Sequence, residues 1–304
     1  MPSWQSRLWT LVARLRFRRR EWGDTAAIAR RARRLFGAPS MLGAWACRGL
    51  RCEPVNGMPV RGEWLMPDDA LPGVVLYVHG GGFVAGSMTS HRPITAALAR
   101  RCHRRVFSVE YRLAPEHPLP AAHDDVTAAY EWLLSTGTQA SQIAVVGDSA
   151  GGNLALGLVV RLRDARRPLP GSVVLFSPWV DLSGSNPSVR TNDGRCAMFR
   201  PGNIAGFAAA ALGNASARNP SLSPQFAELG ALPPVLVHVG STELLLDDAR
   251  EVHRRIQVAG GESHLRIFDD VVHCWQMMVP FVPEASESIV DAAAFLSRHF
   301  GVDE

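Results

Sequence analysis

Short apolar runs typical of buried strands alternate with stretches long enough to form helices, and no other feature of this chain limits the possible folds as strongly. The expected strands are residues 74–78, 106–111, 143–146, 173–176, 235–239 and 264–268. The expected helices are residues 90–102, 124–134, 152–163, 244–258 and 287–300. Strands separated by helices form βαβ units. The sequence therefore predicts an α/β fold, with a mostly parallel sheet covered by helices on both faces.

Two segments lie outside this alternation. Residues 55–58 contain an Asn-Gly pair, which predicts a hairpin turn between two short extended stretches. Residues 181–222 hold clusters of Gly, Asn, Pro and Ser around a short apolar helix expected at 204–212, and an insertion beside the carboxyl ends of parallel strands is a usual position for a lid. Because no linker divides the chain, we expect a single domain over residues 1–304. Its body is expected at about 48–304, with a cap formed by about 1–47 and part of 181–222.

The first 35 residues carry most of the positive charge. All 32 basic residues of the chain are arginines, and residues 1–35 hold ten of them against Glu21 and Asp24. The same segment predicts an amphipathic helix with an apolar stripe at Trp4, Leu8, Leu11, Val12 and Leu15. We expect this helix to dock on the body through the stripe, and contact with a membrane surface or an acidic partner is the alternative. No basic patch persists elsewhere, so nucleic-acid binding is not expected.

The sequence lacks the patterns of secreted, membrane-spanning and metal-binding proteins. Arg14 interrupts the N-terminal apolar stretch and no cleavage site of small residues follows, so we expect a cytoplasmic location. Apolar runs such as residues 154–160 are far shorter than the roughly 20 residues of a membrane helix. C-x-x-C pairs are missing, which predicts isolated thiols rather than disulfides or a zinc site at Cys47, Cys52, Cys102, Cys196 and Cys274.

A glycine-rich turn joins the expected strand 143–146 to the expected helix 152–163. It reads Gly147-Asp-Ser-Ala-Gly-Gly152 and contains the pattern G-x-S-x-G, with Ser149 at its centre. The flanking glycines are needed because Cβ atoms there would collide with the neighbouring strand and helix in so tight a turn. Such a turn lifts the serine hydroxyl above the sheet, which predicts that Ser149 is a nucleophile.

A second glycine-rich motif, His79-Gly-Gly-Gly-Phe83, ends the expected strand 74–78. Consecutive glycines leave backbone N–H groups accessible, so the chain can fold around an oxygen atom and donate hydrogen bonds to it. This motif is typical of a loop that stabilises an oxyanion. Together, the two motifs in this order predict acyl-transfer chemistry rather than flexible turns.

A serine of ordinary pKa is a weak nucleophile, so it needs a general base, and the base needs an orienting acid. The expected order along the chain is Ser, then Asp or Glu, then His. His273 lies in the loop after the last expected strand, which is the position of the base. Glu243 lies in the loop after strand 235–239, whereas Asp247 and Asp248 fall a turn into the next helix. We therefore predict His273 as the base and Glu243 as the acid, with Asp247 as the alternative acid.

These motifs resemble the hormone-sensitive lipase-like (family IV) carboxylesterases of the α/β-hydrolase superfamily. Tyr111–Pro118, Ser177–Asp181 and the loop before His273 add to the resemblance, which spans about residues 60–300. The resemblance implies an α/β-hydrolase fold with a helical cap. It also implies that Ser149 is the nucleophile and that the oxyanion is bound by the N–H groups of Gly81, Gly82 and Ala150. The common family pattern at the acid is Asp-Pro-Leu-x-Asp, and the corresponding Glu243-Leu-Leu-Leu-Asp247 resembles the subgroup with glutamate in that place.

The resemblance also carries expectations about substrate and partners. It implies a small-molecule ester substrate with a short to medium acyl chain, and a homodimer; the chemistry needs neither a metal nor an organic cofactor. The segment 111–118 is expected to brace the oxyanion loop, and the expected pocket walls are Phe83, Val84, Met88 and Trp179. Lactone, amide or carbamate hydrolysis on the same triad is the alternative. A non-catalytic receptor similar to the plant gibberellin receptors, which lack the histidine, is not favoured because His273 is present.

Overall fold

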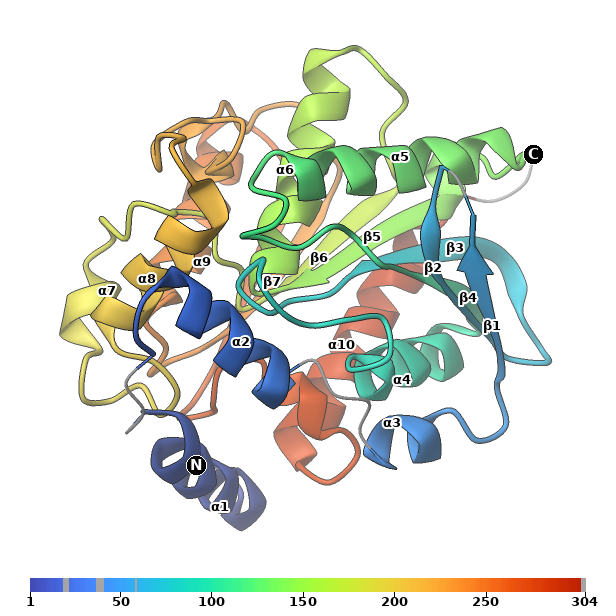
Figure 1. Ribbon diagram of the computed structural model, residues 1–304. Coiled ribbons are helices and arrows are strands. Elements are labelled where there is room, and N and C mark those ends of the chain that lie inside the picture. The colour runs from blue at the N-terminus through green and yellow to red at the C-terminus, as the bar shows by residue number, and fades with distance from the viewer. Residues whose placement is uncertain (19–21, 37–40, 58, 302–304) are drawn as a thin grey trace.

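The computed structural model describes residues 1–18, 22–36, 41–57 and 59–301, and it confirms the predicted α/β class. Within these residues, eight strands form one sheet in the order β1-β2-β4-β3-β5-β6-β7-β8. The strands are β1 (Arg51–Asn56), β2 (Arg61–Met66), β3 (Leu71–Val78), β4 (Arg104–Val109), β5 (Ile143–Asp148), β6 (Ser172–Phe176), β7 (Val235–Gly240) and β8 (Ser263–Phe268). β2 pairs antiparallel with β1 and β4, and the other neighbouring pairs are parallel (Figure 1).

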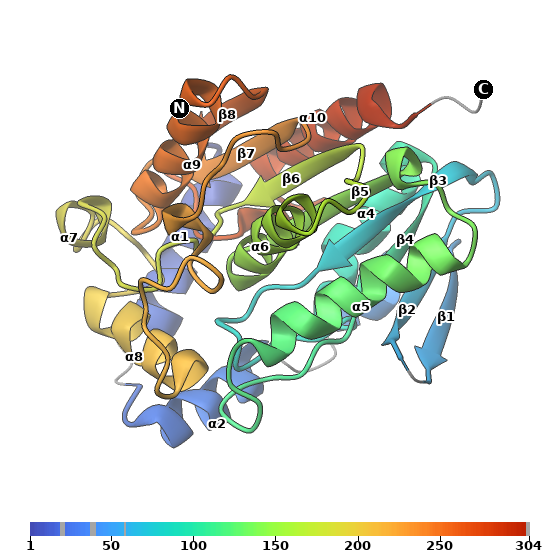
Figure 2. The ribbon, with the colours of Figure 1, turned by 90° about the horizontal axis from the view of Figure 1, so that it is seen from above.

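Helices cover both faces of the sheet, because alternate residues of a strand point to opposite faces. Val74, Leu76 and Val78 of β3 belong to one hydrophobic core, and Val75 and Tyr77 belong to another. The first core includes residues of α5 (Ala121–Ser135), α6 (Ala150–Asp164) and α9 (Leu246–Val258). The second core includes residues of α4 (Arg92–Cys102) and α10 (Pro283–His299). Seen from above, the sheet lies between α5 and α6 on one side and α4 and α10 on the other (Figure 2).

The predicted strands and helices are found close to their expected positions. The predicted hairpin is formed by β1 and β2, although Met58 lies outside the described residues. α10 begins at Pro283, earlier than expected, because proline suits the first helical turn, where the N–H has no intrahelical acceptor. α9 begins later than expected, at Leu246, since Glu243 lies in the turn after β7. Short 3-10 helices occur at η2 (Ala140–Gln142), η3 (Pro224–Phe226) and η4 (Trp275–Met278).

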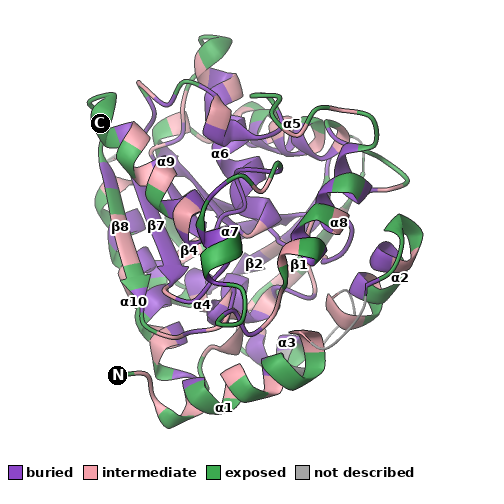
Figure 3. Cartoon of the chain, turned by 90° about the vertical axis from the view of Figure 1, so that its left-hand side faces the viewer, coloured by how far each residue is buried: buried purple, intermediate pink, exposed green. Residues whose placement is uncertain are grey.

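The N-terminal helix α1 (Trp4–Ala13) continues as a π-helical turn, η1 (Arg14–Arg18), and lies at one edge of the molecule (Figure 3). The prediction that its apolar stripe docks on the body is wrong, because most of the stripe faces solvent, with exposed fractions of 70% for Trp4, 51% for Leu8, 54% for Leu11 and 52% for Leu15. Val12 is half-buried. The helix is held by polar contacts instead. Ser3 donates to Glu284 through its N–H and its hydroxyl, and Arg14 donates to the carbonyl of Arg195.

The segments expected to form a cap contribute further helices. They are α2 (Thr25–Phe36), α3 (Met41–Ala46), α7 (Ser188–Thr191) and α8 (Pro201–Leu212). α2 and α8 pack against each other, and the ring of Trp22, just before α2, lies 5.2 Å from that of Phe207 in α8. α3 packs instead on α4, where Arg100 donates to the carbonyl of Ala46 at 2.6 Å. The residues 37–40 between α2 and α3, and the arginines at 19 and 20, lie outside the described residues.

Two further sequence expectations concern membrane spans and cysteines. None of the described helices has the length and apolar character needed to cross a bilayer. All five cysteines lie in the described part of the chain and are free thiols, as predicted. One of them, Cys274, lines the cavity described below.

Candidate active site

Ser149 occupies a sharp turn between β5 and α6. Its φ of 53° lies in the left-handed region, which is rare for a residue with a side chain and characteristic of strained functional turns. A Cβ on Gly147 would lie 2.2 Å from the carbonyl oxygen of Gly151, and a Cβ on Gly151 would lie 2.0 Å from the carbonyl oxygen of Val78. Glycine is therefore required at both positions, and the turn has the form predicted from the sequence.

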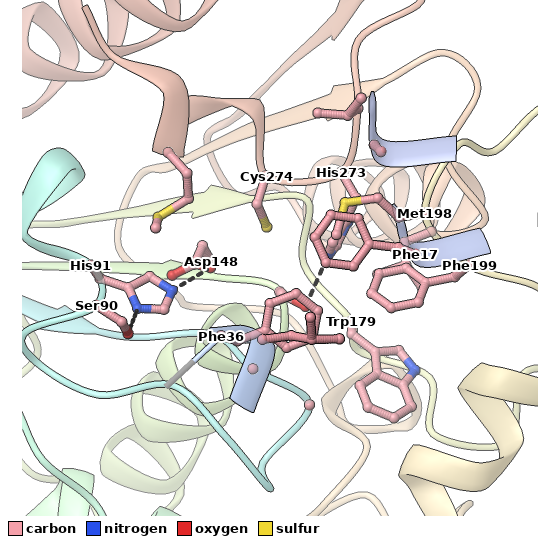
Figure 4. A pocket seen from close by; sticks show the side chains of 18 of the residues that line it. Phe17, Phe36, Ser90, His91, Asp148, Trp179, Met198, Phe199, His273 and Cys274 are labelled. Atoms are coloured by element: carbon pink, nitrogen blue, oxygen red, sulfur yellow. Dashed lines mark hydrogen bonds and ion pairs between the residues drawn. The ribbon is translucent and has the colours of Figure 1, made fainter. Parts of the chain in front are cut away.

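The three side chains predicted to act together are in hydrogen-bond contact. His273 Nε2 lies 2.9 Å from Ser149 Oγ, and His273 Nδ1 lies 2.5 Å from Glu243 Oε2. Glu243 is 1% exposed and His273 is 8% exposed. Figure 4 shows His273 among the side chains that line the cavity, close to Met198. The arrangement gives the imidazole one nitrogen to take a proton from the serine and another to donate to the carboxylate.

Further hydrogen bonds fix the carboxylate of Glu243. Its Oε1 accepts from the hydroxyl of Ser177 at 2.7 Å and from the N–H of Gly240 at 2.6 Å. Sequence reasoning did not assign a role to either residue, although Ser177 begins the Ser177–Asp181 motif. These bonds leave Oε2 directed at His273.

The alternative acid, Asp247, lies in a different environment. Its carboxylate accepts from the N–H of Ser188 at 2.8 Å and pairs with Arg250 at 3.1 Å. The described contacts of Asp247 do not include His273. The geometry therefore favours Glu243 over Asp247 as the partner of the imidazole.

The glycines of the His79–Phe83 motif bend the loop beside Ser149. Gly81 has a φ of 120° and Gly82 a φ of 64°, and both line the same cavity as the serine. A Cβ on Gly81 would lie 2.2 Å from the carbonyl oxygen of Ala85. Ala150 is the first residue of α6, so its N–H belongs to the first turn, where backbone donors have no intrahelical acceptor. Gly81 and Gly82 thus line the same cavity as Ser149, and Ala150 follows the serine directly in the chain.

Asp148 connects this loop to the serine turn. Its Oδ1 accepts from the N–H of Gly80 at 2.9 Å and from the hydroxyl of Tyr77 at 2.6 Å. Its Oδ2 lies 3.4 Å from His91 Nε2. Burial disfavours the charged forms of the His91 imidazole and the Asp148 carboxylate, but each group stabilises the charged form of the other. The carboxylate raises the pKa of His91, and the imidazole holds the pKa of Asp148 at about 2.

The loop is also braced from its other side. Tyr111 donates to the carbonyl of His79 at 2.8 Å, and the two rings stack with centroids 4.2 Å apart. The N–H of Ala114 donates to the carbonyl of Phe83 at 2.9 Å. The segment 111–118 therefore contacts the oxyanion loop, in the place where the resemblance implied a brace.

Arg33 of α2 reaches the same region from the N-terminal helices. Its guanidinium donates to the carbonyl of Val84 at 2.8 Å and to that of Ala114 at 3.0 Å. It also pairs with Glu116, which raises the pKa of Arg33 and lowers the pKa of Glu116 to about 2. One side chain thus ties α2 to the backbone on both sides of the loop.

Ser149 faces a cavity of about 290 Å³ with a predominantly apolar wall. Of the four predicted wall residues, Trp179 lines it (Figure 4). The other predicted wall residues, Phe83, Val84 and Met88, are not part of this lining. Phe83 and Val84 are buried in the hydrophobic core, and the ring of Phe83 lies 5.6 Å from that of Trp179.

Several wall residues were missed by sequence reasoning. Trp9, Ala13 and Phe17 come from α1 and η1, and their regular spacing of four residues was the available signal. Phe199 packs edge-on against the ring of His273, with centroids 5.4 Å apart. No period marks Phe199, which lies in the loop before α8. Among the described residues, no three His, Cys, Asp or Glu side chains form a metal-binding cluster.

Comparison with known proteins agrees with this architecture. Residues 75–277 match a protein family described as having the alpha/beta hydrolase fold. The chain is 37% identical over 239 residues to an acetyl-hydrolase from Streptomyces hygroscopicus, covering 79% of this chain and 80% of that protein. It is 34% identical over 247 residues to an esterase from Acinetobacter venetianus, covering 81% of this chain and 82% of that protein.

Solved structures lead to the same family. An esterase from the bacterial hormone-sensitive lipase family superimposes with a TM-score of 0.88 at 35% identity, covering 99% of this chain and 100% of that chain. The esterase EstE5, in a crystal soaked with p-nitrophenyl butyrate, superimposes with a TM-score of 0.89 at 33% identity, covering 99% of this chain and 100% of that chain. With this fold and these relatives, the chain belongs to the hormone-sensitive lipase-like carboxylesterases of the α/β-hydrolase superfamily and is a carboxylic ester hydrolase.

Proposed function

We propose that this carboxylesterase hydrolyses short- to medium-chain acyl esters through the triad Ser149, His273 and Glu243. The observation that carries the proposal is the unbroken hydrogen-bonded chain from Ser149 Oγ through the imidazole to Glu243, with distances of 2.9 Å and 2.5 Å, at the edge of an apolar cavity. A nucleophile, a base and an orienting acid in direct contact are the parts that acyl transfer to serine requires.

The reaction has two halves. In the first, Ser149 Oγ attacks the ester carbonyl carbon while His273 Nε2 takes the hydroxyl proton, and the carbonyl oxygen becomes an oxyanion. The intermediate then collapses, the bond to the alcohol oxygen breaks, and the imidazolium returns the proton to the leaving alcohol. In the second half, His273 takes a proton from water as the water attacks the acyl-enzyme carbonyl carbon. The bond from that carbon to Ser149 Oγ then breaks, and the imidazolium returns the proton to Ser149 Oγ as the acid leaves. Glu243 orients the imidazole and stabilises its charged form in both halves.

The oxyanion would be held by the backbone N–H groups of Gly81, Gly82 and Ala150. Backbone donors fixed before the reaction stabilise developing charge without reorganising, and each is worth roughly 10²- to 10³-fold in kcat. The positive φ values of the two glycines, and the position of Ala150 at the start of α6, support this assignment.

The cavity supports the preference for short to medium acyl chains. Its volume of about 290 Å³ and its apolar wall suit a small hydrocarbon chain rather than a charged one. We further propose that the chain is one domain whose cap comes from about 1–47 and part of 181–222. Side chains of α1, α2 and α8 line the cavity, which supports a cap at these helices.

Hydrolysis of p-nitrophenyl esters of graded acyl length tests the proposal. We expect turnover of the acetyl and butyryl esters and a decline toward long chains. Ser149→Ala should lose at least about 10⁴-fold in kcat. The matched control is Ser221→Ala, which removes an exposed hydroxyl that bonds within its own turn. A parent protein that is inert on every ester, or a Ser149→Ala variant as active as the control, would refute the proposal; turnover confined to lactones, amides or carbamates would change the substrate class.

A further inference from the structure

Helix α1 has two faces with different surroundings. Trp9, Ala13 and Phe17, on one side of α1 and η1, line the substrate cavity. On the other side Trp4, Leu8, Leu11 and Leu15, here called the α1 stripe, are each more than half exposed. Their spacing of four, three and four residues places them on one helix face. An uncovered apolar face of this kind marks an interaction surface rather than part of the core.

The charges around the α1 stripe indicate what covers it. Residues 1–18 contain four arginines and no acidic residue. Arg7 and Arg14 are exposed beside the stripe, and with Arg195 they line a second cavity, which Asp269 and Asp270 also line. An apolar stripe bordered by arginines is typical of a helix that lies in the plane of an anionic lipid surface. An apolar protein partner would not require the arginines.

We propose that α1 docks on an anionic lipid surface, with the α1 stripe among the acyl chains and Arg7 and Arg14 at the headgroups. The docking itself does not depend on the proposed function. The consequence for catalysis rests on the proposed function. Because the opposite side of α1 lines the cavity that holds Ser149, docking places that cavity about one helix diameter, roughly 10 Å, from the lipid. Short- to medium-chain esters that reach the lipid surface would then be hydrolysed faster than the same esters in bulk water.

The test is sedimentation of the full chain with vesicles of phosphatidylcholine alone or mixed with phosphatidylglycerol. We expect the parent to bind the mixed vesicles at low ionic strength and to bind the neutral ones much more weakly. Two double variants remove the surface: Leu8→Gln with Leu11→Gln, and Arg7→Gln with Arg14→Gln. Each should weaken partitioning by about tenfold or more.

Matched controls remove equivalent side chains elsewhere on the molecule. Leu71→Gln with Val290→Gln removes two exposed apolar side chains, and Arg61→Gln with Arg101→Gln removes two exposed arginines. Both controls should bind within about twofold of the parent, since the stripe and its arginines are intact. Hydrolysis of the soluble p-nitrophenyl acetate checks that each variant is folded.

The outcomes separate docking from catalysis. A parent that does not sediment with anionic vesicles, or a Leu8→Gln, Leu11→Gln variant that binds as well as the parent, overturns the proposal. A second result also overturns the proposal: the parent is a dimer that does not bind vesicles, and one of the double variants is a monomer. This result would show that a second copy of the chain covers the α1 stripe. A parent inert on every ester refutes the proposed function, while the vesicle measurement still decides docking.

Discussion

The carboxylate of Asp148 accepts a hydrogen bond from the N–H of Gly80 at 2.9 Å, across 68 positions of the chain. The residue before Ser149 therefore holds the first glycine of the oxyanion loop. The contact is tight, because a Cβ on Gly80 would lie 2.3 Å from Asp148 Oδ2. The side chain of Asp148 thus helps to fix the proposed oxyanion loop relative to the proposed nucleophile.

Removal of this acceptor should misplace the oxyanion loop. We expect Asp148→Ala to lower kcat by about 10- to 100-fold with a smaller change in KM, because the donors matter most in the transition state. Asp148→Asn keeps an oxygen for Gly80 and Tyr77 and should lose less than the alanine variant. Steady-state kinetics on p-nitrophenyl butyrate, with circular dichroism as a check of folding, measures both; equal losses in the two variants would contradict a positional role.

The two candidate acids, Glu243 and Asp247, should respond differently to conversion into amides. Glu243→Gln removes the negative charge that orients and stabilises the imidazolium, so kcat should fall by about 10²- to 10⁴-fold. Asp247→Asn is the matched control because its carboxylate bonds to Ser188 and Arg250 instead, and it should stay within about threefold of the parent. Hydrolysis rates of the purified variants decide the assignment. A larger loss for Asp247→Asn would transfer the role to that residue.

Gly82 should not tolerate a side chain. A Cβ there would lie 2.6 Å from Cδ1 of Phe207, and the φ of 64° is strained for alanine. We expect Gly82→Ala to lower kcat by roughly 10²-fold through displacement of an oxyanion donor. Gly184→Ala provides the control, since Gly184 has a φ of 62° but no atom within 4 Å of the added Cβ. Similar kinetics for the two variants would remove the case for Gly82 in the oxyanion hole.

Buried His123 should make the fold sensitive to acid. Burial lowers the pKa of His123 from 6.5 to about 3, so the unfolded chain takes up this proton first as the pH falls. The contribution of neutral His123 to the free energy of unfolding is therefore complete above pH 6.5 and is lost progressively toward pH 3. Between about pH 7 and about pH 5, the parent should lose about 1 to 2 kcal/mol more unfolding free energy than His123→Gln, whose amide still reaches Asn153.

Urea unfolding at the two pH values measures this difference. His117→Gln, at an exposed histidine, is the control and should keep the pH dependence of the parent. If His123→Gln shows the same loss as the parent, His123 is not the group that carries the acid sensitivity.

The strand and helix order could be read from the sequence because buried parallel strands and amphipathic helices have distinct periods. The position of Ser149 was equally legible, since a tight turn demands glycines at fixed spacing, and His273 could be found because it lies in the loop after the last expected strand. The cavity wall was less accessible. Phe83 follows the oxyanion glycines, yet its side chain lies in the core, and only the three-dimensional path of the loop reveals this. The orientation of α1 was wrong because periodicity identifies an apolar face but not what that face meets.

Arg33 links the proposed cap to the glycine-rich loop beside Ser149. Because this arginine of α2 bonds to the carbonyls of Val84 and Ala114, a helix of the proposed cap also supports the proposed oxyanion loop. Exchange of the N-terminal helices with those of a relative should therefore alter rate as well as selectivity, unless Arg33 and the carbonyls that it bonds are kept together. With the roles proposed here, substrate selection and reaction rate depend on the same arginine.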